Sequence, residues 1–244
     1  MPTETVIVVG DAHLGQVPAA VDEAFRAFLL EVPQPGDHLI VNGDLFDFWF
    51  EYRSVIPRHA FPTLAALDHT RRRDVRLTLI GGNHDRWGGS FWERELGAAF
   101  HPRAAELPLA GWRAHVAHGD GLADPLAGGR MLHVVTHHPW TAGLFRLLHP
   151  DLGNWMVGHF SRGVAEQTRD ERTLARAAGL QETYARGLLD RRTELDLVVL
   201  GHTHRPALAA VAARRWYLNP GAWMNGFSYA VITADGPSLR QFRG

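Results

Sequence analysis

Five short, mostly apolar runs in this 244-residue chain are each followed by a glycine that stands beside an aspartate, an asparagine or a histidine. The runs are Thr5–Val9, His38–Val41, Val75–Ile80, Arg113–Ala117 and Leu195–Leu200. Their length and their β-branched residues predict buried strands. In open α/β sheets, polar residues at the carboxyl ends of the strands line one crevice. The pattern therefore predicts an α/β chain whose polar strand ends converge on a single site.

Apolar residues at helical spacing predict two helices between the first three strands, at Pro18–Leu30 and Phe61–Arg73. Two further runs with β character, Arg215–Leu218 and Ser228–Thr233, follow late in the chain. Strands that alternate with helices early and form hairpins late predict an α/β sandwich with mixed sheets. Residues 122–192 break this rhythm with a helical pattern rich in aromatic residues and histidines. We expect an inserted helical cap there, within a single domain that spans the whole chain.

Composition narrows the available chemistry. The chain has no cysteine, which excludes disulfides and thiolate catalysis and leaves histidine and oxygen ligands for any metal. Its formal net charge is -1, without the basic excess typical of proteins that bind nucleic acid, so we expect no nucleic-acid partner. No apolar run reaches the roughly 18 residues of a membrane span, and the first residues lack the pattern of a signal peptide. We therefore expect a cytoplasmic protein, and peripheral contact with the inner membrane face remains open.

The polar residues after the five runs are of the types that bind transition metals. The local sequences are GDAHLG, GDLFDFW, GGNHD, HGDG and GHTH. Imidazole together with carboxylate suits manganese, iron, zinc or cobalt better than calcium. The candidate metal ligands are Asp11, His13, Asp44, Asn83, His118, His202 and His204. Seven ligands are too many for one ion but suffice for two divalent cations, with manganese the first choice, if the Asp44 carboxylate bridges them.

Each motif also has a simpler interpretation when it is taken singly. A Gly-Asp pair is commonly a turn, and GNHD can be a turn capped by Asn83. In favour of a metal site, alternation along an extended segment would point Asp11 and His13 to one side. The same alternation would point His202 and His204 to one side. Five such motifs in one order, each at an expected strand end, favour the metal interpretation.

The blocks D-x-H, G-D, G-N-H-D, H and G-H-x-H resemble the signature of the calcineurin-like metallophosphoesterases, and all five are present here. The resemblance covers most of the chain and implies a four-layer α-β-β-α sandwich with a dinuclear site. It assigns the first metal to Asp11, His13, Asp44 and His204, and the second to Asp44, Asn83, His118 and His202. His84 matches the family's catalytic histidine beside the scissile phosphate, where it would protonate the leaving oxygen or stabilise charge. Asp47 and Asp85 either orient these groups or cap turns.

Three longer stretches, GDLFDFWFEY, HGDGL and LHPDLG, resemble the branch of this family that cleaves UDP-2,3-diacylglucosamine. The likeness is to members that keep GNHD, and not to those with arginine in place of His84. It implies a pyrophosphatase of lipid A biosynthesis that releases UMP and 2,3-diacylglucosamine 1-phosphate at the inner membrane face. The expected partner is therefore a phosphorylated small molecule or a lipid-linked nucleotide.

Substrate contacts are expected beside the metal site and in the cap. The aromatic residues after Asp44 form either a packed core loop or a substrate platform with Arg53 at its rim. The apolar residues of the cap either pack two helices together or hold acyl chains. The candidate substrate contacts are Arg53, Asp120, Trp140, Phe145, Ser161 and Arg162.

Two other functions remain open at this stage. One is a general phosphodiesterase or nucleotide phosphatase that acts on a water-soluble substrate. The other is a catalytically inactive scaffold of the same fold. We expect such a scaffold to have lost ligands, whereas all seven positions here carry competent residues.

Overall fold

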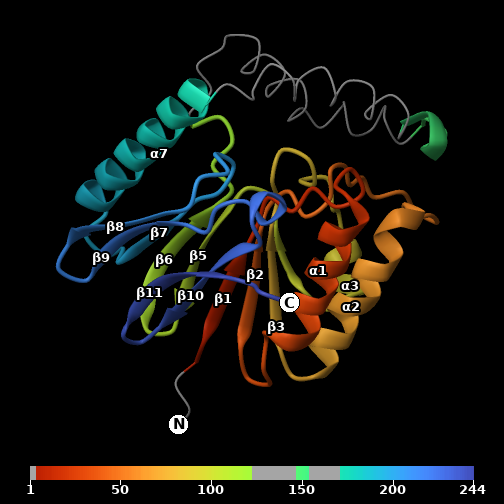
Figure 1. The fold of residues 1–244 in the computed structure, drawn as a ribbon, viewed down its shortest axis with the longest axis horizontal. Coiled ribbons are helices and arrows are strands. Elements are labelled where there is room, and N and C mark those ends of the chain that lie inside the picture. Colours follow the sequence, from red (N-terminus) through yellow and green to blue (C-terminus); the bar gives the residue numbers. More distant parts are fainter. Residues whose placement is uncertain (1–3, 123–146, 154–170) are drawn as a thin grey trace.

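Two mixed sheets carry the fold in the computed structural model, which describes residues 4–122, 147–153 and 171–244 (Figure 1). The first sheet has the strand order β11-β10-β1-β2-β3-β4, and the second has the order β5-β6-β7-β9-β8. The strands of the first sheet are β1 (Val6–Val9), β2 (His38–Asn42), β3 (Arg76–Ile80), β4 (Ala99–His101), β10 (Ser228–Thr233) and β11 (Gly236–Gln241). Those of the second are β5 (Ala104–Leu109), β6 (Trp112–Ala117), β7 (Leu197–Val199), β8 (Ala207–Ala212) and β9 (Arg215–Asn219).

The central strands of each sheet are parallel, so their carboxyl ends share one edge. In the first sheet β1, β2 and β3 run parallel, with Val8 opposite Ile40 and Ile40 opposite Thr78. In the second sheet β7 runs parallel to both β6 and β9. Antiparallel partners flank these strands, because β10 pairs with β1, β5 with β6 and β8 with β9. The loops that leave the parallel strands therefore gather along one edge, at the upper ends of the strands in Figure 1.

Alternation along the central strands builds four layers. Ile7 and Val9 of β1 pack with the apolar faces of two helices, whereas Val6 and Val8 pack between the sheets. On the other side, Val198 of β7 packs against a third long helix. The helices are α1 (Ala19–Glu31), α2 (Phe61–Arg72), α3 (Phe91–Arg94) and α7 (Glu171–Arg191), with short 3-10 turns at η1 (Arg58–Ala60) and η2 (Trp223–Asn225). Figure 1 shows α1 to α3 on one side of the two sheets and α7 on the other. The predicted α-β-β-α sandwich is confirmed.

The strands that the sequence did not predict are the four edge strands, β4, β5, β8 and β11. β5 and β11 contain Pro108 and Pro237, which sheets tolerate mainly at edges and bulges. β8 reads ALAAVA, and alanine is a weak strand former. The predicted strands and helices agree with the observed ones to within two residues at each end.

The structure describes only part of the region predicted as a cap. Its helix α7 covers the outer face of the second sheet. The predicted substrate contacts Trp140, Phe145, Ser161 and Arg162 lie outside the described residues. None of the helices in the described ranges is long and apolar enough to cross a bilayer.

Candidate metal centre

Loops from both sheets bring predicted ligands together at the carboxyl ends of the parallel strands. Asp11 and His13 follow β1, and Asp44 follows β2. His118 follows β6, while His202 and His204 follow β7. These side chains, with His84, form three overlapping groups in which the potential ligand atoms all lie within 4.8 Å of one another.

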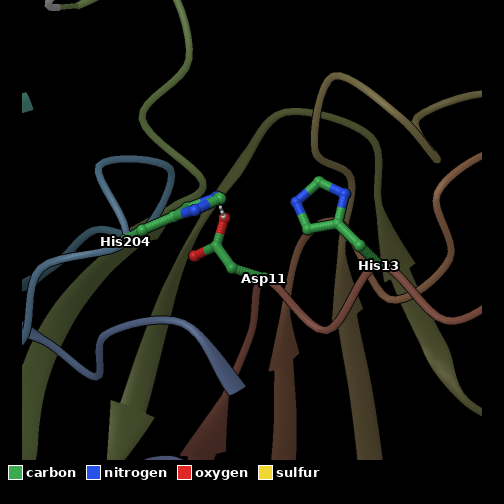
Figure 2. A group of neighbouring side chains, drawn as sticks. All are labelled: Asp11, His13 and His204. Atoms are coloured by element: carbon green, nitrogen blue, oxygen red, sulfur yellow. Dashed lines mark ion pairs between the residues drawn. The ribbon is translucent and has the colours of Figure 1, made fainter. Parts of the chain in front are cut away.

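The first group consists of Asp11, His13 and His204 (Figure 2). The Asp11 carboxylate points toward His204, with Oδ1 3.3 Å from Nε2. The His13 ring approaches from another direction, and its centroid lies 5.4 Å from that of His204. Asp11 is fully buried, whereas the His204 side chain is 27% exposed. The carboxylate is therefore sealed inside the protein, and the imidazole lines the open side of the group.

The second group consists of Asp44, His118 and His202. His118 Nε2 lies 3.1 Å from Asp44 Oδ2 and 3.9 Å from Asp11 Oδ1, so this ring stands between the two carboxylates. The rings of His118 and His202 meet edge to face, with their centroids 5.2 Å apart. Asp44 Oδ2 also lies 3.7 Å from His13 Nε2. Asp44 therefore contacts both halves of the cluster, which is the place expected of a bridging ligand.

Left-handed turns of the backbone, rather than strand alternation, produce this convergence. The φ angles are 50° at Asp11, 48° at His13, 52° at Asp44, 69° at His202 and 58° at His204. Residues other than glycine seldom adopt this region, and each such conformation costs about 1–3 kcal/mol. The prediction that an extended backbone points Asp11 with His13, and His202 with His204, to one side is therefore wrong. Both pairs nevertheless converge on the cluster.

Two glycines allow the loops to approach one another this closely. A Cβ atom on Gly82 would lie 2.1 Å from Asp44 Oδ1, and a Cβ atom on Gly43 would lie 2.3 Å from His118 Nδ1. Gly43 also has a φ of 81°. The requirement for glycine beside the polar residues is thus steric as well as conformational.

Backbone hydrogen bonds fix the orientation of the polar side chains. Asp11 Oδ2 accepts the N–H of His202 at 3.0 Å, and Asp44 Oδ1 accepts the N–H of His84 at 3.0 Å. His118 Nδ1 donates to the carbonyl of Asn42 at 3.0 Å. Each carboxylate therefore has one oxygen tied to the backbone and one directed at the imidazoles, and His118 presents Nε2, as metal-binding histidines do.

Asp85 ties two of the loops together. Its Oδ1 accepts the N–H of Gly82 and its Oδ2 accepts the N–H of Leu45, both at 2.8 Å. Burial, reinforced by the nearby Asp44, raises the pKa of Asp85 to about 6. Of the two roles considered for this residue, holding the loop structure is the one that these contacts describe.

The electrostatics of the cluster reflect two buried carboxylates among histidines. Burial alone would raise the pKa of Asp11 and Asp44, but His204 and His118 lower it at Asp11, and His118 and His84 lower it at Asp44. Conversely, burial opposes protonation of His118 and His204, and the carboxylates nevertheless raise the pKa of both. At His202, burial together with the neighbouring His118 lowers the pKa. The two carboxylates are therefore held in the ionised form, and the imidazoles beside them favour a positive charge that a bound cation would replace.

Whether a metal fits this cluster can be judged from three of its buried polar atoms. Among the described residues, Asp11 Oδ1, His13 Nε2 and His118 Nε2 make no hydrogen bond of good geometry, although each faces an imidazole nitrogen or a carboxylate oxygen within 3.7 Å. An unsatisfied buried polar atom costs about 1–3 kcal/mol. A divalent cation satisfies carboxylate oxygen and imidazole nitrogen together. The donor set therefore fits the divalent metals that the sequence resemblance implies.

His84 lies at the rim of the cluster. Its Nδ1 is 2.5 Å from the backbone oxygen of Asp47, and a ring N–H donated there leaves Nε2 available. Its ring meets that of His13 edge to face, with centroids 4.7 Å apart, and its side chain is 25% exposed. This position agrees with a histidine that contacts substrate.

The other predicted residues lie at varied places around the centre. Asn83 sits in the turn between Gly82 and His84 with an exposed side chain, and its role as a ligand stays a prediction. Asp120 forms an ion pair with Arg86, and Arg53 is exposed.

The aromatic residues after Asp44 mostly pack as a core loop. Phe46, Trp49 and Phe50 are buried. Phe46 stacks on Trp49 with centroids 5.4 Å apart, and Trp49 lies 4.8 Å from the Trp92 ring. For these three side chains, the core-loop interpretation holds.

Sequence reasoning missed a buried polar set behind the histidines. Gln181 of α7, Thr203 and Asn219 are at most 1% exposed and contact one another. Thr203 lies inside the GHTH motif, which was its only sequence signal. For Gln181, the local sequence offers only its spacing of four and eight residues from the apolar Ala185 and Leu189.

A double-sheet α/β sandwich with buried aspartates and histidines at the ends of its parallel strands is the architecture of a metal-dependent hydrolase. Residues 4–206 match the family model of the calcineurin-like phosphoesterases, and the chain belongs to this family.

Relatives of similar length match nearly the whole chain. The UDP-2,3-diacylglucosamine hydrolase of Porphyromonas gingivalis is 26% identical over 269 residues, which cover 96% of this chain and 95% of that protein. The protein of the same name from Escherichia coli O81 is 28% identical over 239 residues, which cover 97% and 98%. Among solved structures, vacuolar protein sorting 29 from Cryptosporidium parvum aligns with 98% of this chain and 92% of its own, at 13% identity and a TM-score of 0.47.

Proposed function

We propose that this phosphoesterase hydrolyses the pyrophosphate bond of UDP-2,3-diacylglucosamine and releases UMP and 2,3-diacylglucosamine 1-phosphate. The observation that carries the phosphoester chemistry is the convergence of Asp11, Asp44 and the surrounding histidines in one buried cluster. The similarity of nearly the whole chain to proteins named UDP-2,3-diacylglucosamine hydrolase supports the particular substrate.

The proposed ligands follow the grouping of the side chains. The first cation is assigned to Asp11, His13, Asp44 and His204, and the second to Asp44, Asn83, His118 and His202. Two bound cations, with manganese the first choice, would bind phosphate oxygens and lower the pKa of the attacking water. The contacts that support the shared position of Asp44 are those of its Oδ2 atom, which lies 3.1 Å from His118 Nε2 and 3.7 Å from His13 Nε2.

The remaining steps belong to side chains of the protein. His84 presents Nε2 to the substrate, where it protonates the leaving phosphate oxygen or donates a hydrogen bond to a non-bridging oxygen. The backbone carbonyl of Asp47 holds the ring in this orientation. The hydrogen bonds from His202 N and His84 N keep the two carboxylates fixed during turnover.

The lipid part of the substrate places the enzyme at the inner membrane face as a peripheral protein. In this proposal, Trp140 and Phe145 hold acyl chains, and Ser161 and Arg162 contact the sugar or its phosphate. Because these four residues lie outside the described ranges, the proposal for them rests on the sequence. Arg53 remains a candidate contact at the exposed rim.

A substrate panel tests the proposal. The protein is stripped with a chelator and reloaded with Mn²⁺. It is then given detergent-solubilised UDP-2,3-diacylglucosamine, a UDP-sugar without acyl chains, simple nucleotides and bis(p-nitrophenyl) phosphate. We expect UMP release from the lipid with a kcat/KM far above that of every water-soluble ester. Faster cleavage of a water-soluble ester would support a general phosphodiesterase or nucleotide phosphatase instead. No Mn²⁺-dependent turnover of any substrate would support an inactive scaffold.

A cap variant separates lipid recognition from the chemical step. Replacing Trp140 and Phe145 together by alanine is expected to reduce turnover of the lipid more than turnover of bis(p-nitrophenyl) phosphate. Equal losses with both substrates would mean that these residues only support the fold.

A further inference from the structure

A buried amide side chain joins helix α7 to both loops of the second sheet that carry candidate histidine ligands. Gln181 is 0% exposed, and its Nε2 donates to the backbone oxygen of Gly119 at 3.2 Å. Its Oε1 accepts from the Thr203 hydroxyl at 3.4 Å and from Asn219 Nδ2 at 3.5 Å. One side chain therefore contacts the loop after β6 and the loop after β7.

These contacts fall directly beside the predicted ligands. Gly119 follows His118 in the chain, and Thr203 stands between His202 and His204. Thr203 is 1% exposed, so water does not compete for its hydroxyl. The amide therefore contacts residues that are adjacent in the sequence to all three candidate ligand histidines.

Asn219 completes the set from behind. Its Nδ2 donates to the Gly201 carbonyl at 3.2 Å and to the Thr203 hydroxyl oxygen at 3.1 Å. Its Oδ1 accepts the N–H of Gly221 at 2.9 Å. With Gln181, it encloses the turn that carries the two histidines of the GHTH motif.

The backbone of these loops needs such support. The φ angle is 69° at His202 and 58° at His204, and left-handed conformations of non-glycine residues persist only where the surroundings hold them. Gly119 has a φ of 97°, and a Cβ atom there would lie 2.6 Å from Gln181 Nε2. The loop and the amide therefore pack so closely that no side chain fits between them at position 119.

Packing of α7 does not by itself require a glutamine at this position. Ala185 and Leu189, four and eight residues further along the same helix face, are 0% exposed and dock α7 in an apolar cluster with Val198 and Leu200. An apolar residue would continue that face, whereas a buried amide needs partners for each polar atom. What the glutamine adds to helix packing is a pair of hydrogen bonds that hold the loop after β6 and the loop after β7 in place.

We infer that Gln181 is a positioning residue for the metal centre, which holds both loops so that His118, His202 and His204 point at the cations. The inference rests on the proposed assignment of these histidines as ligands. It also makes cation binding depend on a helix of the region predicted as a cap.

The test compares two variants of the full chain. Gln181→Met keeps the length of the side chain and removes its hydrogen bonds. Leu189→Ala, on the same face of α7, weakens docking and leaves the amide in place. Chelator-stripped proteins are titrated with Mn²⁺ by calorimetry, and Tm is recorded for each. We expect Gln181→Met to weaken Mn²⁺ binding by about tenfold or more, with kcat for bis(p-nitrophenyl) phosphate largely restored at saturating Mn²⁺. Leu189→Ala lowers Tm and keeps the affinity of the wild type.

Two results overturn the inference. One is wild-type Mn²⁺ affinity in folded Gln181→Met. The other is an equal loss of affinity in Leu189→Ala, which would assign the effect to docking of the helix in general.

A second pair of variants decides the case if Gln181→Met does not fold. Thr203→Val is nearly isosteric and removes the hydroxyl that donates to Gln181, while Thr203→Ser retains a hydroxyl. We expect weaker Mn²⁺ binding in the valine variant only, and equal affinities in the two variants contradict the inference. Because Mn²⁺ binding is measured without a lipid, failure of the wild-type protein to cleave UDP-2,3-diacylglucosamine refutes the proposed substrate alone.

Discussion

Replacing Gly82 by alanine is expected to disable the metal centre, although the change removes no polar group. The added Cβ atom would lie 2.1 Å from Asp44 Oδ1 and 2.7 Å from the Asp44 backbone nitrogen. Carbon and its neighbours pack comfortably at about 3.5 Å, so the carboxylate oxygen has to move by about 1.4 Å. That movement breaks its 3.0 Å hydrogen bond from His84 N. A misplacement of about 1 Å in a catalytic site costs on the order of 100-fold.

We therefore expect kcat/KM for bis(p-nitrophenyl) phosphate to fall by about 100-fold or more in Gly82→Ala, with less Mn²⁺ retained after dialysis. The measurements are steady-state kinetics, metal analysis and a thermal melt that shows the variant is folded at the assay temperature. Gly179→Ala in α7 is the matched control, because a Cβ atom there meets nothing within 4 Å. Its activity should be unchanged and its stability equal or higher by up to about 1 kcal/mol. Wild-type affinity and turnover in folded Gly82→Ala would falsify the steric reasoning.

Three further predictions follow from the same contacts. Asp44→Ala removes the shared carboxylate, so metal analysis should find both cations lost and no turnover; retained activity contradicts a bridging role. His84→Ala should keep its Mn²⁺ content and lose about 10²–10⁴-fold in kcat, whereas loss of the metal would make His84 a ligand. His38 is buried beside Arg76, and burial, reinforced by that charge, lowers its pKa from 6.5 to about 3. Because the folded-state pKa is the lower one, its stabilising contribution is complete above pH 6.5 and is lost as the pH falls toward 3. Between pH 7 and pH 5, urea unfolding should show a loss of about 2 kcal/mol that His38→Gln lacks, and equal losses in both proteins would contradict this account.

The sequence by itself determined the central strands and the chemistry of the site. β1 and β2 are buried along their whole length, so β1 reads VIVV and β2 has the apolar core LIV between His38 and Asn42. The glycine and the polar residue that follow each strand are a local signal of the site. The chain must turn within a few residues of the strand end to present the polar side chain, and glycine allows that turn. The edge strands lacked such signals. β5 and β11 carry prolines and β8 is mostly alanine, and these segments are strands because a neighbouring strand offers hydrogen bonds.

The tertiary structure alone decided how the site is held. Asp11 and His204 lie far apart in the chain, and only the facing of the two sheets brings Oδ1 and Nε2 to 3.3 Å. Gln181 reads as an ordinary helical residue, and it is buried because it meets loops 62 and 22 positions away. Local patterns encode turns, strands and donor types, since those depend on adjacent residues. Contacts between distant loops depend on packing, which no short stretch of sequence contains.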